Sequence, residues 1–156
     1  MRERVKAGTL ELEVDTDPSR IDVPLVHSYL SRDSYWAKGM PEEVLRKGIA
    51  NALCFGAYLP DGRQVAFCRV ITDRATFGWL SDVFVVPELR GKGVSKALMD
   101  RVIAHPDLQG FRRFLLATRD AHELYGRFGF KPLAKPEIYM EIWEPTVYLK
   151  GEPGRA

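Results

Sequence analysis

Residues 85–98 read Val85-Val86-Pro87-Glu88-Leu89-Arg90-Gly91-Lys92-Gly93-Val94-Ser95-Lys96-Ala97-Leu98. An apolar, β-branched run ends at the proline, a basic turn with two glycines follows, and an apolar helical repeat then begins. Such a turn aims backbone N–H groups, the N-terminus of a helix and cationic side chains at one point. The stretch therefore predicts a strand–turn–helix unit that binds a phosphate group.

The composition limits the class of protein around this turn. With 156 residues, 46% of them hydrophobic, we expect one domain over 1–156, with a core over about 10–143 and a flexible tail over 144–156. The charges, 23 Lys and Arg against 21 Asp and Glu, do not suggest a surface for nucleic acid. We expect a cytoplasmic protein without a membrane partner, because neither a signal peptide nor a membrane-spanning run is present. Cys54 and Cys68 lie in apolar runs and are interpreted as buried thiols, so no metal is expected.

Hydrophobic periodicity predicts an α/β fold (α+β, with a mixed sheet) and the element order β-α-α-β-β-β-α-β-α-β. The central strand, helix and strand around the glycine turn form a right-handed crossover in this prediction. The expected strands cover residues 10–14, 53–59, 64–72, 76–86, 114–117 and 138–142, and the expected helices cover 21–30, 41–49, 94–103 and 120–128.

A glycine turn alone is weak evidence for a ligand. This one lacks the lysine–serine ending of a nucleotide-binding loop, and Gly91 and Gly93 do not complete a GxGxxG motif. A tight turn with solvated basic side chains is therefore an equal alternative. A second motif changes this balance: one predicted strand–helix unit downstream, residues 121–132 read AHELYGRFGFKP.

Together the two segments resemble the Gcn5-related N-acetyltransferase (GNAT) family, in a small, bacterial-type member. Residues 90–95 are similar to the family's Q/R-x-x-G-x-G/A loop for the acyl-CoA pyrophosphate, and Leu124-Tyr125 followed by Phe128-Gly129-Phe130 resembles its leucine-tyrosine…glycine-phenylalanine signature. The resemblance runs from about residue 10 to residue 142. Ser95 departs from the family's Gly or Ala, and Thr118 stands where many members carry an asparagine that touches the cofactor.

The resemblance implies the GNAT acyl-CoA N-acyltransferase fold and acetyl-CoA as the acyl donor. The end of the strand before the turn would pair with the pantetheine arm, and a splay beside it would admit the thioester. The cofactor-binding residues implied are Phe84, Val85, Val86, Arg90, Gly91, Lys92, Gly93, Val94, Ser95, Lys96, Thr118, Tyr125 and Phe128.

Two residues are candidates for proton transfer. Tyr125 is the candidate general acid, because a phenol with a pKa of about 10 can donate to a thiolate whose conjugate thiol has a pKa near about 8.5. The alternative is a tyrosine that only packs on the sheet. Asp82 is the candidate base, acting on the ammonium through water. Alternatively, Asp82 is a charge that binds substrate or one half of an ion pair at a strand edge. In either case a chain of water molecules is the base.

Substrate recognition is expected near the loop 34–40, where aromatic faces attract cations and apolar groups alike. The leading prediction is an N-acetyltransferase that acts on a primary amine of a small or amino-acid-like molecule. The alternatives are a protein or peptide N-acetyltransferase and a non-catalytic acyl-CoA sensor, and a homodimer is possible by analogy with the family. The candidate substrate-binding residues are Tyr29, Tyr35, Trp36, Arg74 and Trp79.

Overall fold

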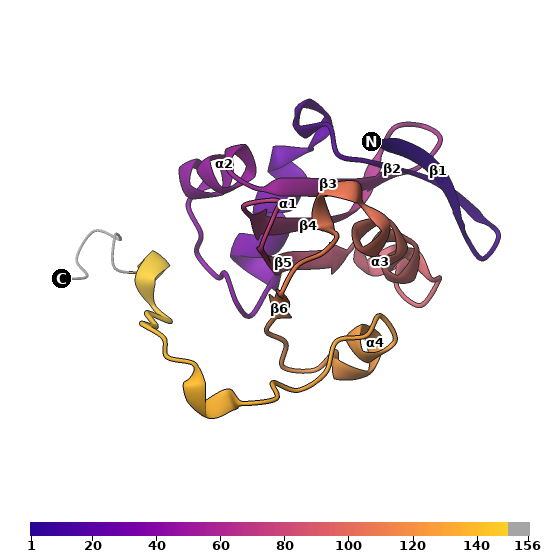
Figure 1. The fold of residues 1–156 in the computed structure, drawn as a ribbon. Coiled ribbons are helices and arrows are strands. Elements are labelled where there is room, and N and C mark those ends of the chain that lie inside the picture. The colour runs from indigo at the N-terminus through magenta and orange to yellow at the C-terminus, as the bar shows by residue number, and fades with distance from the viewer. Residues whose placement is uncertain (150–156) are drawn as a thin grey trace.

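A six-stranded mixed sheet organises residues 1–149, the part of the chain that this computed structural model describes (Figure 1). The strands lie in the order of the sequence; the first five are antiparallel to their neighbours, and the last runs parallel to the fifth. The strands are β1 (Arg2–Ala7), β2 (Leu10–Asp15), β3 (Leu53–Tyr58), β4 (Gln64–Thr72), β5 (Phe77–Val85) and β6 (Arg113–Leu116).

Helices cover both faces of this sheet. The α-helices of residues 1–149 are α1 (Val23–Ser28), α2 (Glu42–Ala50), α3 (Val94–Ala104) and α4 (His122–Gly126). Helix α1 continues into one π-helical turn, Tyr29–Asp33, and it begins where the Asp22 carboxylate accepts the N–H of Leu25 at 3.0 Å. Within the described residues, no helix is both long enough and apolar enough to cross a membrane.

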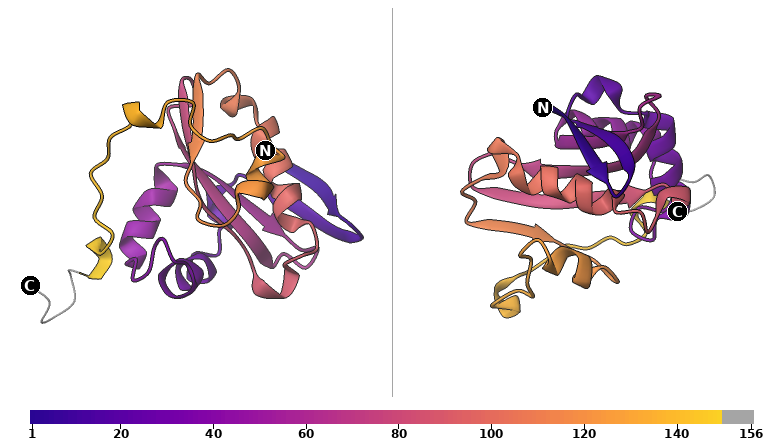
Figure 2. Two further views of the ribbon diagram at one scale, coloured as in Figure 1. Left: turned by 90° about the horizontal axis from the view of Figure 1, so that it is seen from below. Right: turned by 90° about the vertical axis from the view of Figure 1, so that its right-hand side faces the viewer.

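The core has two parts because alternate strand residues point to opposite faces of the sheet. On one face, Phe55 and Val70 pack with residues of α3 such as Leu98. On the other face, Cys54 and Phe67 pack with residues of α1 and α2. The two views in Figure 2 show α3 and the pair α1 and α2 on opposite sides of the strands. The predicted α/β class with a mixed sheet is confirmed.

The edge strand at the N-terminus, β1, is absent from the elements predicted from the sequence. Its residues 2–7 are mostly charged, and only Val5 and Ala7 offer apolar side chains to the sheet. Charged side chains are typical of an edge strand, because they discourage further pairing, but they also weaken the apolar alternation that predicts a strand. The chain therefore begins with a β1–β2 hairpin, with Val5 opposite Leu12.

The predicted last strand over residues 138–142 is wrong. In this segment the Tyr139 ring lies against the guanidinium of Arg113, 5.2 Å from the ring centroid, at the beginning of β6. Met140 and Ile142 are 98% and 100% exposed, so the apolar alternation has no sheet to pair with. The observed order within the described residues is β-β-α-α-β-β-β-α-β-α. Alternation alone is not enough for a strand, because a strand also needs a neighbour for its backbone hydrogen bonds.

The segment that follows belongs to the expected flexible tail from Glu144. Val147–Leu149 form a 3-10 turn, and the Tyr148 ring packs against the α1–α2 side of the core. Residues 150–156 of the expected tail lie outside the described residues.

Candidate active site

An irregularity in the middle of β5 opens the sheet beside the glycine turn. The register of β4 and β5 shifts between Phe67 and Arg69, and Asp82, on the bulged side, has a φ of 57°. A bulge of this kind bends its strand. The pairing of β5 with β6 ends at Leu80 opposite Leu116. The edge of β5 over residues 81–85 therefore borders an opening instead of β6.

The glycine turn lies at one end of this opening. Gly91 and Gly93 have φ values of 74° and 83°, in the left-handed region that favours glycine. Gly93 caps α3, and the N–H groups in the first turn of a helix have no acceptor within the helix. The turn thus presents several backbone donors and the positive end of an eleven-residue helix to one point, the arrangement that binds phosphate.

The basic side chains of the turn are partly committed to protein partners. The guanidinium of Arg90 donates to the hydroxyl of Tyr29 at 2.9 Å, and the Tyr29 ring stacks on Phe84 with a centroid distance of 4.1 Å. Lys96 forms an ion pair with Asp100 at 3.0 Å. The N–H of Val86 donates to the carbonyl of Val65 at 2.9 Å, so this donor is already used. Tyr29, a candidate for substrate binding, thus lies with the turn.

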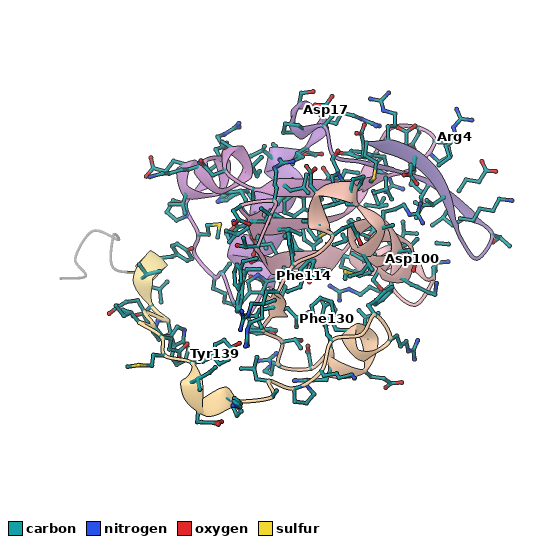
Figure 3. The ribbon with its side chains drawn as sticks, in the orientation of Figure 1. Arg4, Asp17, Asp100, Phe114, Phe130 and Tyr139 are labelled. Carbon is teal, nitrogen blue, oxygen red and sulfur yellow. The ribbon has the colours of Figure 1, made fainter. Side chains whose placement is uncertain are left out.

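Tyr125 lies on α4 at the other end of the opening. Its side chain is 8% exposed, and Phe130, whose ring centroid is 6.1 Å from that of Tyr125, in turn contacts Phe114 of β6 edge-to-face at 5.4 Å (Figure 3). Burial raises the pKa of Tyr125 to about 12. Phe128 packs against the core, and Thr118 accepts the N–H of Ala121 through its hydroxyl at 3.1 Å. Tyr125 is thus a protonated phenol at neutral pH.

A cavity of about 630 Å³ adjoins Tyr125. All three tryptophans of the chain line it, although they come from three distant segments. Carboxylates and one guanidinium stand among these aromatic rings. The aromatic and charged residues that line it are Tyr35, Trp36, Trp79, Asp82, Arg119, Asp120, Tyr125, Glu141 and Trp143.

Asp82 stands in the wall of this cavity and is 5% exposed. One carboxylate oxygen accepts the indole N–H of Trp36 at 2.8 Å. The other oxygen accepts the Nε–H of Arg69, which forms an ion pair with it. Both oxygens therefore accept hydrogen bonds, and a neighbouring cation balances the charge. The hydrogen bond between Trp36 and Asp82 also joins the loop before α2 to the bulge of β5.

The structure brings together five of the predicted residues that face the chemistry or the acceptor: Tyr35, Trp36, Trp79, Asp82 and Tyr125. Arg74 lies elsewhere, at the turn between β4 and β5, where it forms an ion pair with Asp107. It is absent from the residues that line the cavity.

Several residues at the site were missed by the sequence analysis. A signal for Arg69 was present, since it is one charge within the apolar run of β4. Arg119 donates its backbone N–H to the Tyr35 hydroxyl at 2.9 Å and places its guanidinium 4.0 Å from that ring's centroid. No local pattern marks Arg119, Glu141 or Trp143. Within residues 1–149, His, Cys, Asp and Glu do not form a group of three or more that could hold a metal ion.

Comparisons with known proteins agree on one family. A family model described as an acetyltransferase (GNAT) domain matches residues 50–132. A curated Gibberella zeae protein named as a candidate acetyltransferase is 32% identical over 135 residues, 73% of this chain and 75% of that protein. A crystal structure of a candidate GNAT-family acetyltransferase from Xanthomonas campestris is 56% identical, with a TM-score of 0.86, over 88% of this chain and 96% of that one. A Mycobacterium tuberculosis protein, solved in complex with CoA, is 21% identical over 77% of this chain and 72% of its own; its TM-score of 0.63 indicates a common fold.

Proposed function

Because the chain belongs to the GNAT family of acetyltransferases, we propose that it transfers the acetyl group of acetyl-CoA to the primary amine of a small molecule. One observation carries the proposal. The opening between β5 and β6 has a phosphate-binding turn at one end and a buried, protonated Tyr125 beside an aromatic cavity at the other. A donor with a phosphorylated handle and a reactive end a long arm away fits this arrangement.

The residues of the turn suit the pyrophosphate of CoA. A Cβ added at Gly91 would meet no atom within 4 Å, so the backbone there is open to a ligand. The N–H groups of the first turn of α3, together with Lys92, supply donors and positive charge. Ser95 is small enough for the same close approach. A protein of this fold from Clostridium acetobutylicum was solved with acetyl-CoA, which supports the same ligand here.

When bound, acetyl-CoA supplies an activated thioester. Tyr125 would donate its phenolic proton to the leaving sulfur, and its raised pKa means only that the phenol carries this proton at neutral pH. The bulge at Asp82 interrupts the regular pairing of β5 beside the opening, and a backbone N–H group there would stabilise the negative charge on the carbonyl oxygen. The attack of the amine would form the amide bond and break the carbon–sulfur bond. The proton that the nitrogen then loses would pass through water to Tyr125 and replace the proton given to the sulfur.

We assign Asp82 a positioning role in place of the role of base. Both of its oxygens already accept hydrogen bonds, one from the Trp36 indole and one from the Arg69 guanidinium. Its contacts fix the Trp36 indole in the cavity wall and hold the bulge of β5. The proton of the ammonium then passes to water in the mouth of the cavity.

The experiment measures donor binding and turnover separately, on the full chain. Calorimetric titration with acetyl-CoA tests the turn, and release of free thiol with mass detection of the product tests transfer to amines, amino sugars, amino acids and lysine peptides. We expect binding and acetylation of small amines. Absence of acetyl-CoA binding would overturn the proposal. Binding without transfer to any acceptor indicates a sensor, and transfer to peptides alone indicates a protein acetyltransferase.

A further inference from the structure

The C-terminal strap, defined here as residues 139–145, lines one side of the cavity beside Tyr125, which we call the acceptor cavity. Tyr139 is held at the beginning of β6 by Arg113, and beyond the strap Tyr148 packs against the α1–α2 side of the core. Figure 1 shows this segment, coloured toward yellow, running from below the sheet up its left side on the side of α2. Contacts at both ends thus hold this segment, which is neither helix nor strand, beside the site.

Side chains of the strap alternate between two environments. Glu141 and Trp143 line the acceptor cavity, whereas Met140 and Ile142 are almost completely exposed. Residues two apart in the strap thus share an environment, and one side of the strap belongs to the site. Trp143 keeps 72% of its surface exposed, which leaves its ring available to a ligand.

Five aromatic side chains, three of them tryptophans, form part of the cavity wall. Trp36 comes from the loop before α2, Trp79 from β5 and Trp143 from the strap. Tyr35 meets Trp36 edge-to-face with a centroid distance of 5.0 Å and an interplanar angle of 84°, which fixes the loop. Aromatic side chains stack favourably with a flat ring, beyond the gain from buried area alone.

The charges of the cavity favour a ligand that carries a cationic group and no carboxylate. Asp82, Asp120 and Glu141 line it together with a single guanidinium, that of Arg119. Arg69 balances the charge of Asp82, and the remaining two carboxylates exceed the one guanidinium. A ligand with an ammonium group is attracted, and a second anionic group on the ligand is repelled.

From these observations we infer that the acceptor is a primary amine carried on a flat aromatic body, held between Trp36, Trp79 and Trp143, and that the C-terminal strap supplies one wall of its site. The inference rests on the proposed function and names its substrate class. It predicts that phenethylamine is preferred over hexylamine, which is apolar but not flat, and over ethanolamine, which is small and polar.

The test of binding uses tryptophan fluorescence, since every tryptophan of the chain lines the cavity. The three amines are titrated into the full chain in the presence of CoA. We expect phenethylamine to bind about tenfold more tightly than hexylamine, the ratio that an aromatic contact of about 1.4 kcal/mol produces. Equal or reversed affinities would overturn the inference.

Two neighbouring substitutions test the strap. Trp143→Ala removes a ring from the cavity, and Ile142→Ala removes an exposed side chain one residue away. We expect Trp143→Ala to raise the KM for phenethylamine about tenfold and Ile142→Ala to leave it unchanged, with acetyl-CoA affinity unaltered in both. The same KM in both variants would overturn the role of the strap.

The failure of this inference is distinguishable from that of the proposed function. Acetyl-CoA binding with efficient acetylation of ethanolamine or hexylamine, and none of phenethylamine, rejects the aromatic acceptor and leaves the acetyltransferase standing. A lack of acetyl-CoA binding rejects the proposed function, while the fluorescence titration still reports whether the cavity selects an aromatic amine.

Discussion

The two ends of the β5–β6 opening are built in different ways. At the donor end, the glycine turn and the N-terminus of α3 are contiguous in sequence, and their ligand groups are backbone N–H donors. At the acceptor end, the cavity is assembled from four separate segments, and its ligand groups are side chains. Backbone N–H donors are the same whatever the side chains, so the donor end keeps one ligand, a phosphate. A site built from side chains can change its ligand by a few substitutions.

Tyr125 lies at the acceptor end, beside the cavity where the proposed transfer takes place, so its substitution should have the largest effect. We expect Tyr125→Phe to lower kcat about 100-fold, because the sulfur loses its proton donor, while acetyl-CoA affinity stays within a factor of about two. Calorimetry for the donor and steady-state rates with the best amine measure the two quantities. An unchanged kcat would place the proton donor elsewhere.

The pH dependence of the rate also tests whether Tyr125 is the proton donor. Burial raises the pKa of Tyr125 to about 12, so the protonated phenol persists through the alkaline range and is lost only as the pH rises toward that value. The wild-type rate should therefore show no decline from this residue up to about pH 10. Tyr29→Phe is the matched control, since it removes a phenol that binds Arg90 at the donor end, and its kcat should stay near the wild-type value.

Asp82→Asn tests how the acceptor end is held. The amide keeps an oxygen for Trp36, but its NH2 group faces the Arg69 guanidinium, and two donors then meet in a buried place. We expect kcat/KM to fall about tenfold and the free energy of unfolding to fall by about 2 kcal/mol. The shape of the pH–rate profile should persist, because Asp82 positions Trp36 and does not accept the proton.

Asp120→Asn provides the comparison for Asp82. It removes a carboxylate from the same cavity without touching the ion pair with Arg69. We expect its stability to match the wild type. If Asp82→Asn instead abolished the acidic limb of the profile without loss of stability, Asp82 would be the base after all.

The same contrast explains what could be predicted from sequence. The glycine turn and Tyr125 lie in short contiguous motifs, so the resemblance of those motifs to a known family indicated them. The pairing of Arg69 with Asp82 depends on a bulge, which shifts the register of β4 and β5 by tertiary packing. The role of residues 139–145 depends on where Arg113 holds Tyr139, and the alternation of apolar residues in that segment suggested a strand instead.

Gly93→Ala tests the donor end, where we expect the smallest effect on the rate. An alanine at a φ of 83° is strained, at a cost of about 1 kcal/mol, and the strain tilts the N–H groups that bind the pyrophosphate. Acetyl-CoA affinity should fall by about threefold to tenfold, with kcat at saturating donor unchanged.

Gly62→Ala is the matched control for this strain. Gly62 has a φ of 89° and lies in the turn between β3 and β4, where an added Cβ would meet no atom within 4 Å. Both variants should lose similar stability in urea, since the backbone cost is similar. Only Gly93→Ala should weaken acetyl-CoA binding, because only at Gly93 does the backbone conformation itself aim the donors at the ligand. Equal affinities in the two variants would mean that side chains such as Lys92, and not the backbone of the turn, hold the donor.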